Sequence, residues 1–158
     1  MNNAERSMEE LHPLINEAIR VGGQFVLIPK GVSMLPTIEP LKDSLVLVKA
    51  ENLQKNDIIL YKRKSGGYVV HRIIYIKDGE YIMCGDNQIW LEKGIRADMI
   101  IAKVSEIRKQ DGRIVSSQQI RSRGKLFKLG VRRLVRRAVN KAKRLLYPIY
   151  KVIFKRNK

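Results

Sequence analysis

The spacing of hydrophobic and polar residues changes twice along the chain, and these changes divide it into three parts. In residues 4–20 the apolar residues recur at the three- and four-residue spacing of an amphipathic helix, and Gly22-Gly23 follows as a stop signal. Between Gln24 and Ser116 the chain consists of short runs rich in Val, Ile and Tyr, which are typical of β-strands. Beyond Ser116 the helical spacing returns. We therefore expect an N-terminal helix in residues 1–23, a β domain in 24–117 and a helical tail in 118–158.

The central segment contains six predicted strands, separated by turn residues. They are Phe25–Ile28, Ser44–Lys49, Asp57–Arg63, Tyr68–Ile76, Glu80–Cys84 and Ile100–Arg108. The Asp-Gly pairs at 78–79 and 111–112 are hairpin signals, because these residues tolerate the positive φ of a type I′ turn. Six or seven short strands without intervening helices indicate a mainly β fold with an antiparallel, partly closed sheet or barrel.

Charge is distributed as unevenly as hydrophobicity. The chain of 158 residues has 32 Lys and Arg against 15 Asp and Glu, a formal net charge of +17. Residues 1–111 hold 16 of the basic residues and all 15 acids, so this part is nearly neutral. Residues 112–158 hold the other 16 basic residues and no acid. The tail is therefore a predicted basic amphipathic helix, and its candidate membrane-binding residues are Arg132, Arg133, Arg136, Arg137, Lys141 and Arg144.

The apolar side of the tail favours a membrane over its other possible partners. The stripe includes Phe127, Leu134 and Leu146, and a nucleic-acid-binding arm does not need such a stripe. Near an anionic leaflet each Lys or Arg contributes roughly 1 kcal/mol. We expect residues 121–158 to bind an anionic membrane surface. Docking of the stripe on the β domain is the main alternative, and binding of nucleic acid is the less favoured one.

Several features bear on the location of the protein and on its cofactors. No run reaches the roughly 18–20 apolar residues that span a bilayer, and residues 1–20 lack the pattern of a secretory signal. The single cysteine, Cys84, excludes a disulfide framework and most thiolate metal sites. We expect a cytoplasmic protein that associates peripherally with the membrane and uses neither metal nor cofactor.

Three short stretches of the β domain carry side chains suited to catalysis. Ser33 lies at a predicted sharp bend, His71 interrupts an apolar strand, and Asp86 follows a strand in the turn Gly-Asp-Asn. Each alone has a plainer interpretation, as a loop serine, a core histidine or a turn residue. Together they supply a nucleophile, a base that takes its proton and a carboxylate that orients the base.

Four motifs occur in a recognisable order: Gly-x-Ser-Met-x-Pro-Thr at 31–37, Asn-Asp-Ile-Ile-Leu-Tyr at 56–61, Val-His-Arg-Ile-Ile at 70–74 and Gly-Asp-Asn at 85–87. This set resembles the type I signal peptidase family, over roughly residues 24–106. That family shares a β-rich peptidase fold with the LexA-type self-cleaving repressors. The pair His71-Arg72 resembles the branch with a histidine base, found in the endoplasmic reticulum, in archaea and in some spore-forming bacteria. The resemblance implies that Ser33 is the nucleophile, His71 the general base and Asp86 the orienting acid.

Three further positions take their expected roles from this resemblance. Gly31 stands where many members have a serine hydroxyl as second oxyanion donor, and losing such a donor typically costs on the order of 10²–10³ in rate. Glu92 stands where the histidine branch often has a second Asp, six residues after the Asp of Gly-Asp-Asn. Met34 is expected to shape the pocket for a small substrate residue. The family is generally anchored by a membrane-spanning segment, and this chain resembles its small anchorless bacterial members.

The motifs and the tail together predict a serine endopeptidase that cleaves a leader or signal-like peptide near the membrane surface. The peptide would bind in an extended conformation beside Ser33. A LexA-like self-cleaving or regulatory module is the alternative within the fold, although His71 replaces the lysine base and no Ala-Gly or Cys-Gly cleavage sequence precedes Ser33. A non-catalytic module that binds lipid or nucleic acid through the tail is the alternative from a different class.

Overall fold

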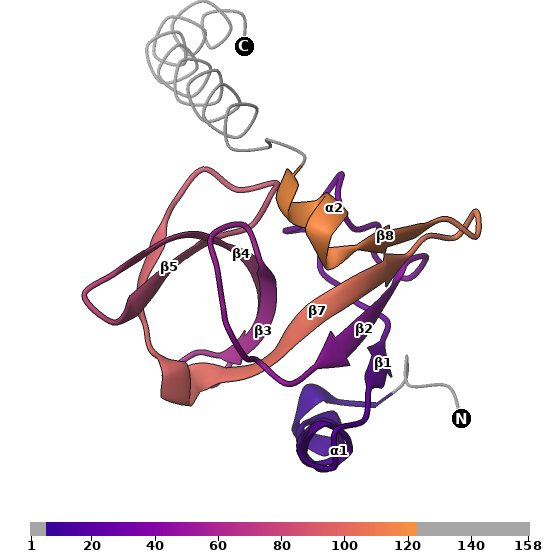
Figure 1. The fold of residues 1–158 in the computed structure, drawn as a ribbon, viewed down its shortest axis with the longest axis horizontal. Coiled ribbons are helices and arrows are strands. Elements are labelled where there is room, and N and C mark those ends of the chain that lie inside the picture. The colour runs from indigo at the N-terminus through magenta and orange to yellow at the C-terminus, as the bar shows by residue number, and fades with distance from the viewer. Residues whose placement is uncertain (1–5, 123–158) are drawn as a thin grey trace, which may run out of the picture. The chain divides into compact units, whose positions relative to one another are not determined.

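The structure is a computed structural model, and it describes residues 6–122. This part of the chain forms one antiparallel sheet with a helix at each end (Figure 1). The helices are α1 (Met8–Arg20) and α2 (Ser117–Ser122), and a 3₁₀ turn spans Ala97–Met99. The strands are β1 (Phe25–Leu27), β2 (Ser44–Val48), β3 (Ile58–Lys62), β4 (Tyr68–Lys77), β5 (Glu80–Cys84), β6 (Glu92–Ile95), β7 (Ile100–Arg108) and β8 (Ile114–Ser116). The predicted mainly β, antiparallel fold with an N-terminal helix is confirmed.

The strands follow the order β1-β2-β7-β3-β4-β5-β6, and β8 pairs with β7 outside this path. Within the described residues β1 and β6 do not pair with each other, so the sheet is open and not closed into a barrel. The long strand β4 changes neighbour along its length. Its first part pairs with β3, where Ile59 lies opposite His71, and the pairing with β5 begins at Arg72. Residues 68–71 of β4 therefore have one edge that no described strand covers.

The two Asp-Gly turns differ from each other. At the β4–β5 turn Asp78 and Gly79 have φ angles of 50° and 76°, as a type I′ turn requires. At the β7–β8 turn only Gly112 has a positive φ, of 83°, and the amide of Lys109 donates to the carbonyl of Arg113. Both Asp-Gly turns connect antiparallel strands, but the β7–β8 turn is not the predicted type I′ turn.

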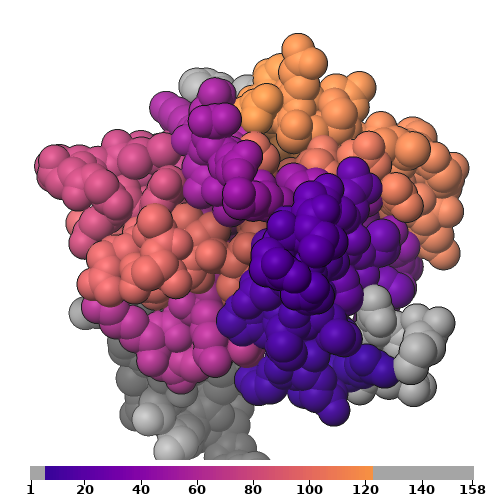
Figure 2. All heavy atoms as spheres, turned by 60° about the horizontal axis from the view of Figure 1, so that its bottom comes forward, coloured from indigo at the N-terminus to yellow at the C-terminus, as the bar shows by residue number. Residues whose placement is uncertain are grey.

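Helix α1 begins and ends on clear sequence signals. Ser7 accepts from the amide of Glu10, and the Glu10 carboxylate accepts from the amide of Ser7, which together form a capping box. At the other end Gly22 adopts a φ of 77°. The apolar face consists of Leu11, Ile15 and Ile19, all buried against the sheet. In the space-filling view this helix packs directly against the strands (Figure 2).

The described residues belong to one compact unit, which extends to Arg123. Within it, α2 packs on the sheet: Ile120 is buried and Arg121 forms an ion pair with Asp57 at 2.9 Å. No helix in residues 6–122 has the length and apolar character needed to cross a bilayer. The predicted membrane-binding residues Arg132, Arg133, Arg136, Arg137, Lys141 and Arg144 lie outside the described part of the chain.

Candidate functional site

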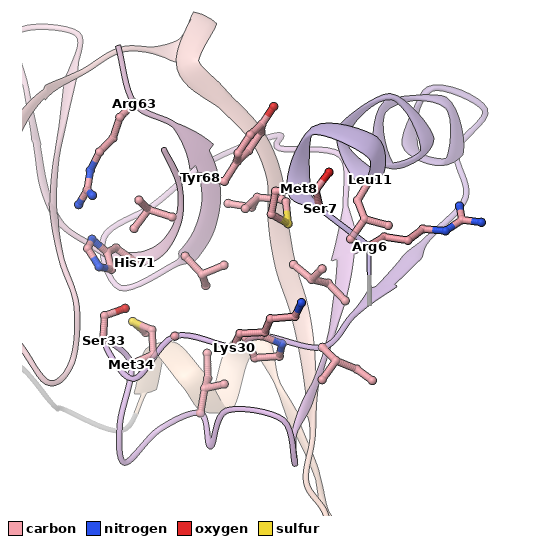
Figure 3. Close-up of a pocket in the computed structure, with 18 of the residues that line it drawn as sticks. Arg6, Ser7, Met8, Leu11, Lys30, Ser33, Met34, Arg63, Tyr68 and His71 are labelled. Atoms are coloured by element: carbon pink, nitrogen blue, oxygen red, sulfur yellow. The ribbon is translucent and has the colours of Figure 1, made fainter. Parts of the chain in front are cut away.

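Ser33 lies in the loop that connects β1 to β2, at one end of a pocket with a volume of about 450 Å³. His71, on β4, lines the same end of this pocket, and Figure 3 shows the Ser33 hydroxyl below the imidazole ring. Gly31 and Met34 also line the pocket, and Met34 is buried. The structure thus brings together the predicted nucleophile, the predicted base and the two neighbouring pocket residues.

The Gly-Asp-Asn turn holds the Ser33 loop in place from the other side. The backbone amide of Asn87 donates to the Ser33 carbonyl at 2.7 Å, and the Asn87 side chain donates to the Val32 carbonyl at 3.2 Å. A Cβ atom at Gly85 would lie 2.6 Å from the Ser33 carbonyl oxygen, so only glycine allows this approach. The motif therefore fixes the backbone that carries the nucleophile.

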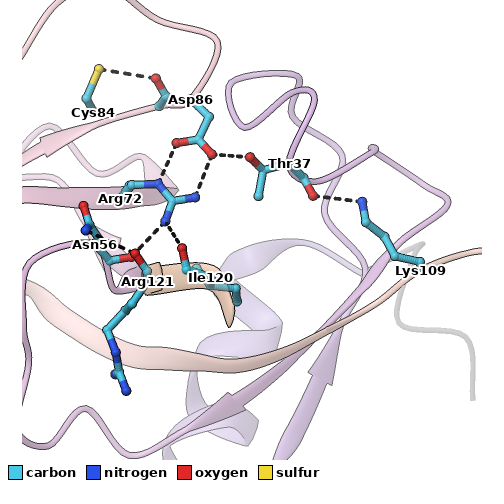
Figure 4. Close-up of polar contacts among 9 residues, drawn as sticks. Thr37, Asn56, Arg72, Cys84, Asp86, Lys109, Ile120 and Arg121 are labelled. Carbon is cyan, nitrogen blue, oxygen red and sulfur yellow. Dashed lines mark hydrogen bonds and ion pairs between the residues drawn. The ribbon is translucent and has the colours of Figure 1, made fainter. Parts of the chain in front are cut away.

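Asp86 occupies a different place from the one predicted for an orienting acid. Its carboxylate accepts two hydrogen bonds from the guanidinium of Arg72, at 2.8 and 2.7 Å, and a third from the hydroxyl of Thr37 (Figure 4). Among the described residues no hydrogen bond joins Asp86 to His71. Both members of the Arg72–Asp86 pair are buried, with side chains exposed by 1% and 3%. The carboxylate thus ties β4 to the loop that carries Ser33.

The carboxylate that faces His71 belongs to Glu92, and Tyr61 lies between them. The Tyr61 hydroxyl is 3.1 Å from His71 Nδ1 and donates to Glu92 Oε2 at 2.8 Å. The direct distance from Glu92 Oε2 to His71 Nδ1 is 3.8 Å. Arg63 holds Glu92 through two hydrogen bonds of 2.7 Å each. His71, Tyr61, Glu92 and Arg63 thus form a continuous hydrogen-bonded network. It extends from the ring of His71 to Glu92 on the edge strand β6.

This chain of hydrogen bonds determines which nitrogen of His71 carries the proton. An ionised carboxylate only accepts, so the single hydroxyl hydrogen of Tyr61 goes to Glu92, whose pKa is lowered chiefly by Arg63. Tyr61 keeps that hydrogen, because burial and then the Glu92 charge raise the pKa of its hydroxyl well above its usual value. The Tyr61 oxygen is then the acceptor for Nδ1–H of His71. The other nitrogen, Nε2, is left with a free lone pair.

His71 is also held in its neutral form. Burial of the ring lowers its pKa to about 4, and the opposing effect of Glu92 is smaller. Nε2 is buried and has no hydrogen-bond partner within residues 6–122, so the Ser33 hydroxyl does not donate to it here. A neutral imidazole with an unoccupied nitrogen is able to accept a proton, and such contacts commonly tighten when substrate binds.

Tyr61 and Arg63 are the site residues that sequence reasoning did not single out. Tyr61 ends the motif at 56–61. Ile59 pairs with His71, and Tyr61 lies two positions further along β3. Tyr61 therefore projects from the same face of the sheet as His71. Arg63 follows directly after that strand. The pairing register would have revealed both, but the register is not visible in the sequence.

Within residues 6–122 no cluster of three His, Cys, Asp or Glu side chains is arranged to hold a metal ion. Comparisons of the chain with protein-family models, with curated proteins and with solved structures found no match.

Proposed function

We propose that this protein is a serine endopeptidase in which Ser33 is the nucleophile and His71 the general base, on a fold of the signal peptidase and LexA type. The observation that carries the proposal is the state of His71. Its ring is buried, neutral and fixed in one tautomer, its Nε2 has no partner among the described residues, and His71 lines the same end of the pocket as Ser33 (Figure 3).

In the proposed reaction the Ser33 oxygen attacks the carbonyl carbon of the substrate peptide bond while its proton passes to Nε2 of His71. The imidazolium then donates that proton to the leaving amine as the C–N bond breaks, which leaves an acyl-enzyme. A water molecule, deprotonated by His71, hydrolyses the ester and frees Ser33. Glu92 stabilises the transient positive charge of His71 through the Tyr61 hydroxyl.

The uncovered edge of β4 supports binding of the substrate as an extended chain. Residues 68–71 pair with β3 on one side only, and this segment ends at His71. A peptide that adds to such an edge is bound through main-chain hydrogen bonds, and its carbonyl groups are brought past the base. A leader or signal-like peptide in an extended conformation fits this mode.

The membrane part of the proposal depends on the sequence of the tail. Residues 112–158 contain 16 basic residues and no acid, and these alternate with an apolar stripe, a pattern that suits the interface of an anionic leaflet. We place the reaction near that surface, with the tail as the peripheral anchor.

The proposal is tested with a library of unstructured peptides, incubated with the full-length protein and read by mass spectrometry. We expect cleavage by the wild type and by Ser65→Ala, a control in the exposed β3–β4 turn. Removing Ser33 or His71 should lower the rate by several orders of magnitude. If no peptide is cut, or if Ser33→Ala cuts as fast as the wild type, the proposed function is wrong.

A further inference from the structure

The pocket beside Ser33 continues well beyond the two catalytic side chains. It runs from Ser33 and His71 along the uncovered part of β4 to the first turn of α1, where Ser7, Met8 and Leu11 close it (Figure 3). The segment from Tyr68 to His71 alone spans about 10 Å, at roughly 3.3 Å per strand residue. An extended peptide along this edge would place every second side chain over the pocket.

The surface of the pocket is mainly apolar. Its half-buried apolar side chains come from α1, the β1–β2 region and β4: Met8, Ile28, Pro29, Val69 and Val70. A volume of about 450 Å³ is far larger than the side chain of alanine or serine needs. A small residue would leave most of this apolar surface in contact with water.

The charged groups around the pocket are all basic. Its lining contains Arg6, Lys30 and Arg63 and no acidic residue. The charge of Arg63 is compensated by Glu92, with which it forms a 2.7 Å ion pair. The side chain of Lys30 extends along the pocket with its ammonium group toward the α1 end (Figure 3). A negative charge on the bound molecule would complement this end.

We propose that the pocket selects a peptide with a large apolar side chain, of the Leu, Met or Phe class, on one side of the scissile bond and with an acidic residue near Lys30. This inference rests on the proposed function. It changes the expectation that Met34 shapes the pocket for a small residue. One methylene group in an apolar pocket corresponds to roughly 10- to 200-fold in kcat/KM, and we expect an advantage of at least about 10-fold for leucine over alanine.

Helix α1 sets the size of the pocket. His12 on α1 contacts Tyr68 on β4 through a 3.1 Å hydrogen bond and an edge-on ring contact with centroids 5.4 Å apart. These contacts fix the first turn of the helix, including Met8, against the strand that carries His71. A larger side chain at residue 8 should therefore shorten the space available to the substrate.

The experiment measures kcat/KM on peptides that differ only at the residue over the pocket (Ala, Leu or Phe) and at the position near Lys30 (Glu, Gln or Lys). Met8→Trp should reduce the preference for Leu and Phe over Ala, expressed as a ratio of kcat/KM values, at least fivefold. Leu14→Trp, on the exposed side of α1, is its matched control and should keep the wild-type preference. Lys30→Glu should reverse the preference from Glu to Lys, whereas Lys55→Glu, an exposed change outside the pocket, should not.

The two levels of the proposal fail in different ways. If cleavage depends on Ser33 but Ala, Leu and Phe peptides are cut equally well, or if Met8→Trp and Leu14→Trp behave alike, the pocket inference is overturned and the peptidase assignment stands. If Lys30→Glu leaves the charge preference unchanged, the acidic part is overturned. If no peptide is cut in a Ser33-dependent way, the proposed function fails, and this inference fails with it.

Discussion

The hydroxyl of Tyr61 fixes the tautomer of His71. It is 3.1 Å from Nδ1 and 2.8 Å from Glu92, so one hydroxyl group connects the ring to a carboxylate that Arg63 already holds. Asp86, the acid that the sequence favoured for this role, is engaged by Arg72 and Thr37. One carboxylate, Glu92, is thus connected to the ring of His71, and another, Asp86, holds the loop that carries Ser33.

This arrangement predicts the effect of Tyr61→Phe. The change leaves the ring and the Arg63–Glu92 pair in place, but Nδ1 loses its buried acceptor, which costs roughly 1–3 kcal/mol. We expect kcat to fall about 10- to 100-fold while KM changes little, as measured by steady-state cleavage of one peptide. Tyr75→Phe, on the exposed part of β4, is the control and should behave as the wild type. An unchanged kcat in Tyr61→Phe would show that the hydroxyl does not orient His71.

The sequence predicted some of these residues more easily than others, for a physical reason. Ser33 and His71 could be named because a polar group in a bent loop or an apolar strand stands out in the local pattern. The direction in which Asp86 points could not be predicted, since a motif records the residue type and not its partner. Tyr61 could not be singled out without the strand register, which depends on packing between distant segments. The catalytic roles themselves stay predictions.

The side chain of Arg72 connects several elements of the fold through hydrogen bonds. Besides Asp86, its guanidinium donates to the carbonyl of Asn56 at 2.8 Å and to that of Ile120 at 3.4 Å. Lys109, which directly follows β7, donates a hydrogen bond to the Thr37 carbonyl (Figure 4). It also forms an ion pair with buried Asp43 at 2.6 Å. The position of the Ser33 loop thus depends on β4, β7 and α2 together.

Replacing Arg72 by Met should therefore destabilise the protein strongly. The variant leaves Asp86 buried without its cation, and breaking a buried pair in this way costs about 3–5 kcal/mol. Arg113→Met removes one member of an exposed pair with Asp111 and should cost less than about 1 kcal/mol. Urea unfolding of both variants measures the free energies of unfolding. Equal, small losses in the two variants would contradict the structural role of Arg72.

The sequence predicted those helices and strands correctly whose hydrophobic pattern is long or whose turn residues are specific. Helix α1 and the strand Glu80–Cys84 lie where the periodicity predicted them, and the turn at Asp78-Gly79 has the expected φ angles. Strand β6 was missed, because its sequence Glu-Lys-Gly-Ile has one apolar side chain and a glycine. It forms through pairing with β5, a tertiary contact that overrides a weak local preference.

At the scale of the whole molecule, the chain divides into a nearly neutral compact unit and a basic segment. The compact unit extends to Arg123, and Arg121 contributes to it through the ion pair with Asp57. The remaining basic residues of the tail are therefore the ones we expect at the membrane. Most of the charge that dominates the composition therefore lies in a different part of the sequence from the candidate catalytic residues.

Truncation after residue 123 tests this division. We expect the shortened protein to keep a cooperative unfolding transition, because the contacts of its core lie within the described unit. The full chain should sediment with vesicles that contain anionic lipid, in part even at high salt because the apolar stripe inserts, whereas the truncated protein should stay in the supernatant. Neutral vesicles are the control. Equal binding by both proteins would show that the tail is not the anchor.

The central claim is that a neutral His71 activates Ser33, and the pH profile of kcat/KM tests it most directly. The active form of a general base is the unprotonated one, so activity falls as the pH drops through the pKa of the folded protein. With that pKa lowered to about 4 by burial, a peptide without titratable groups should be cut at a constant rate from pH 7 down to about 5 and more slowly near pH 4. His71→Ala should remove this profile together with most of the activity. An acid limb near 6.5, the usual value for an exposed histidine, or full activity in His71→Ala would contradict the account.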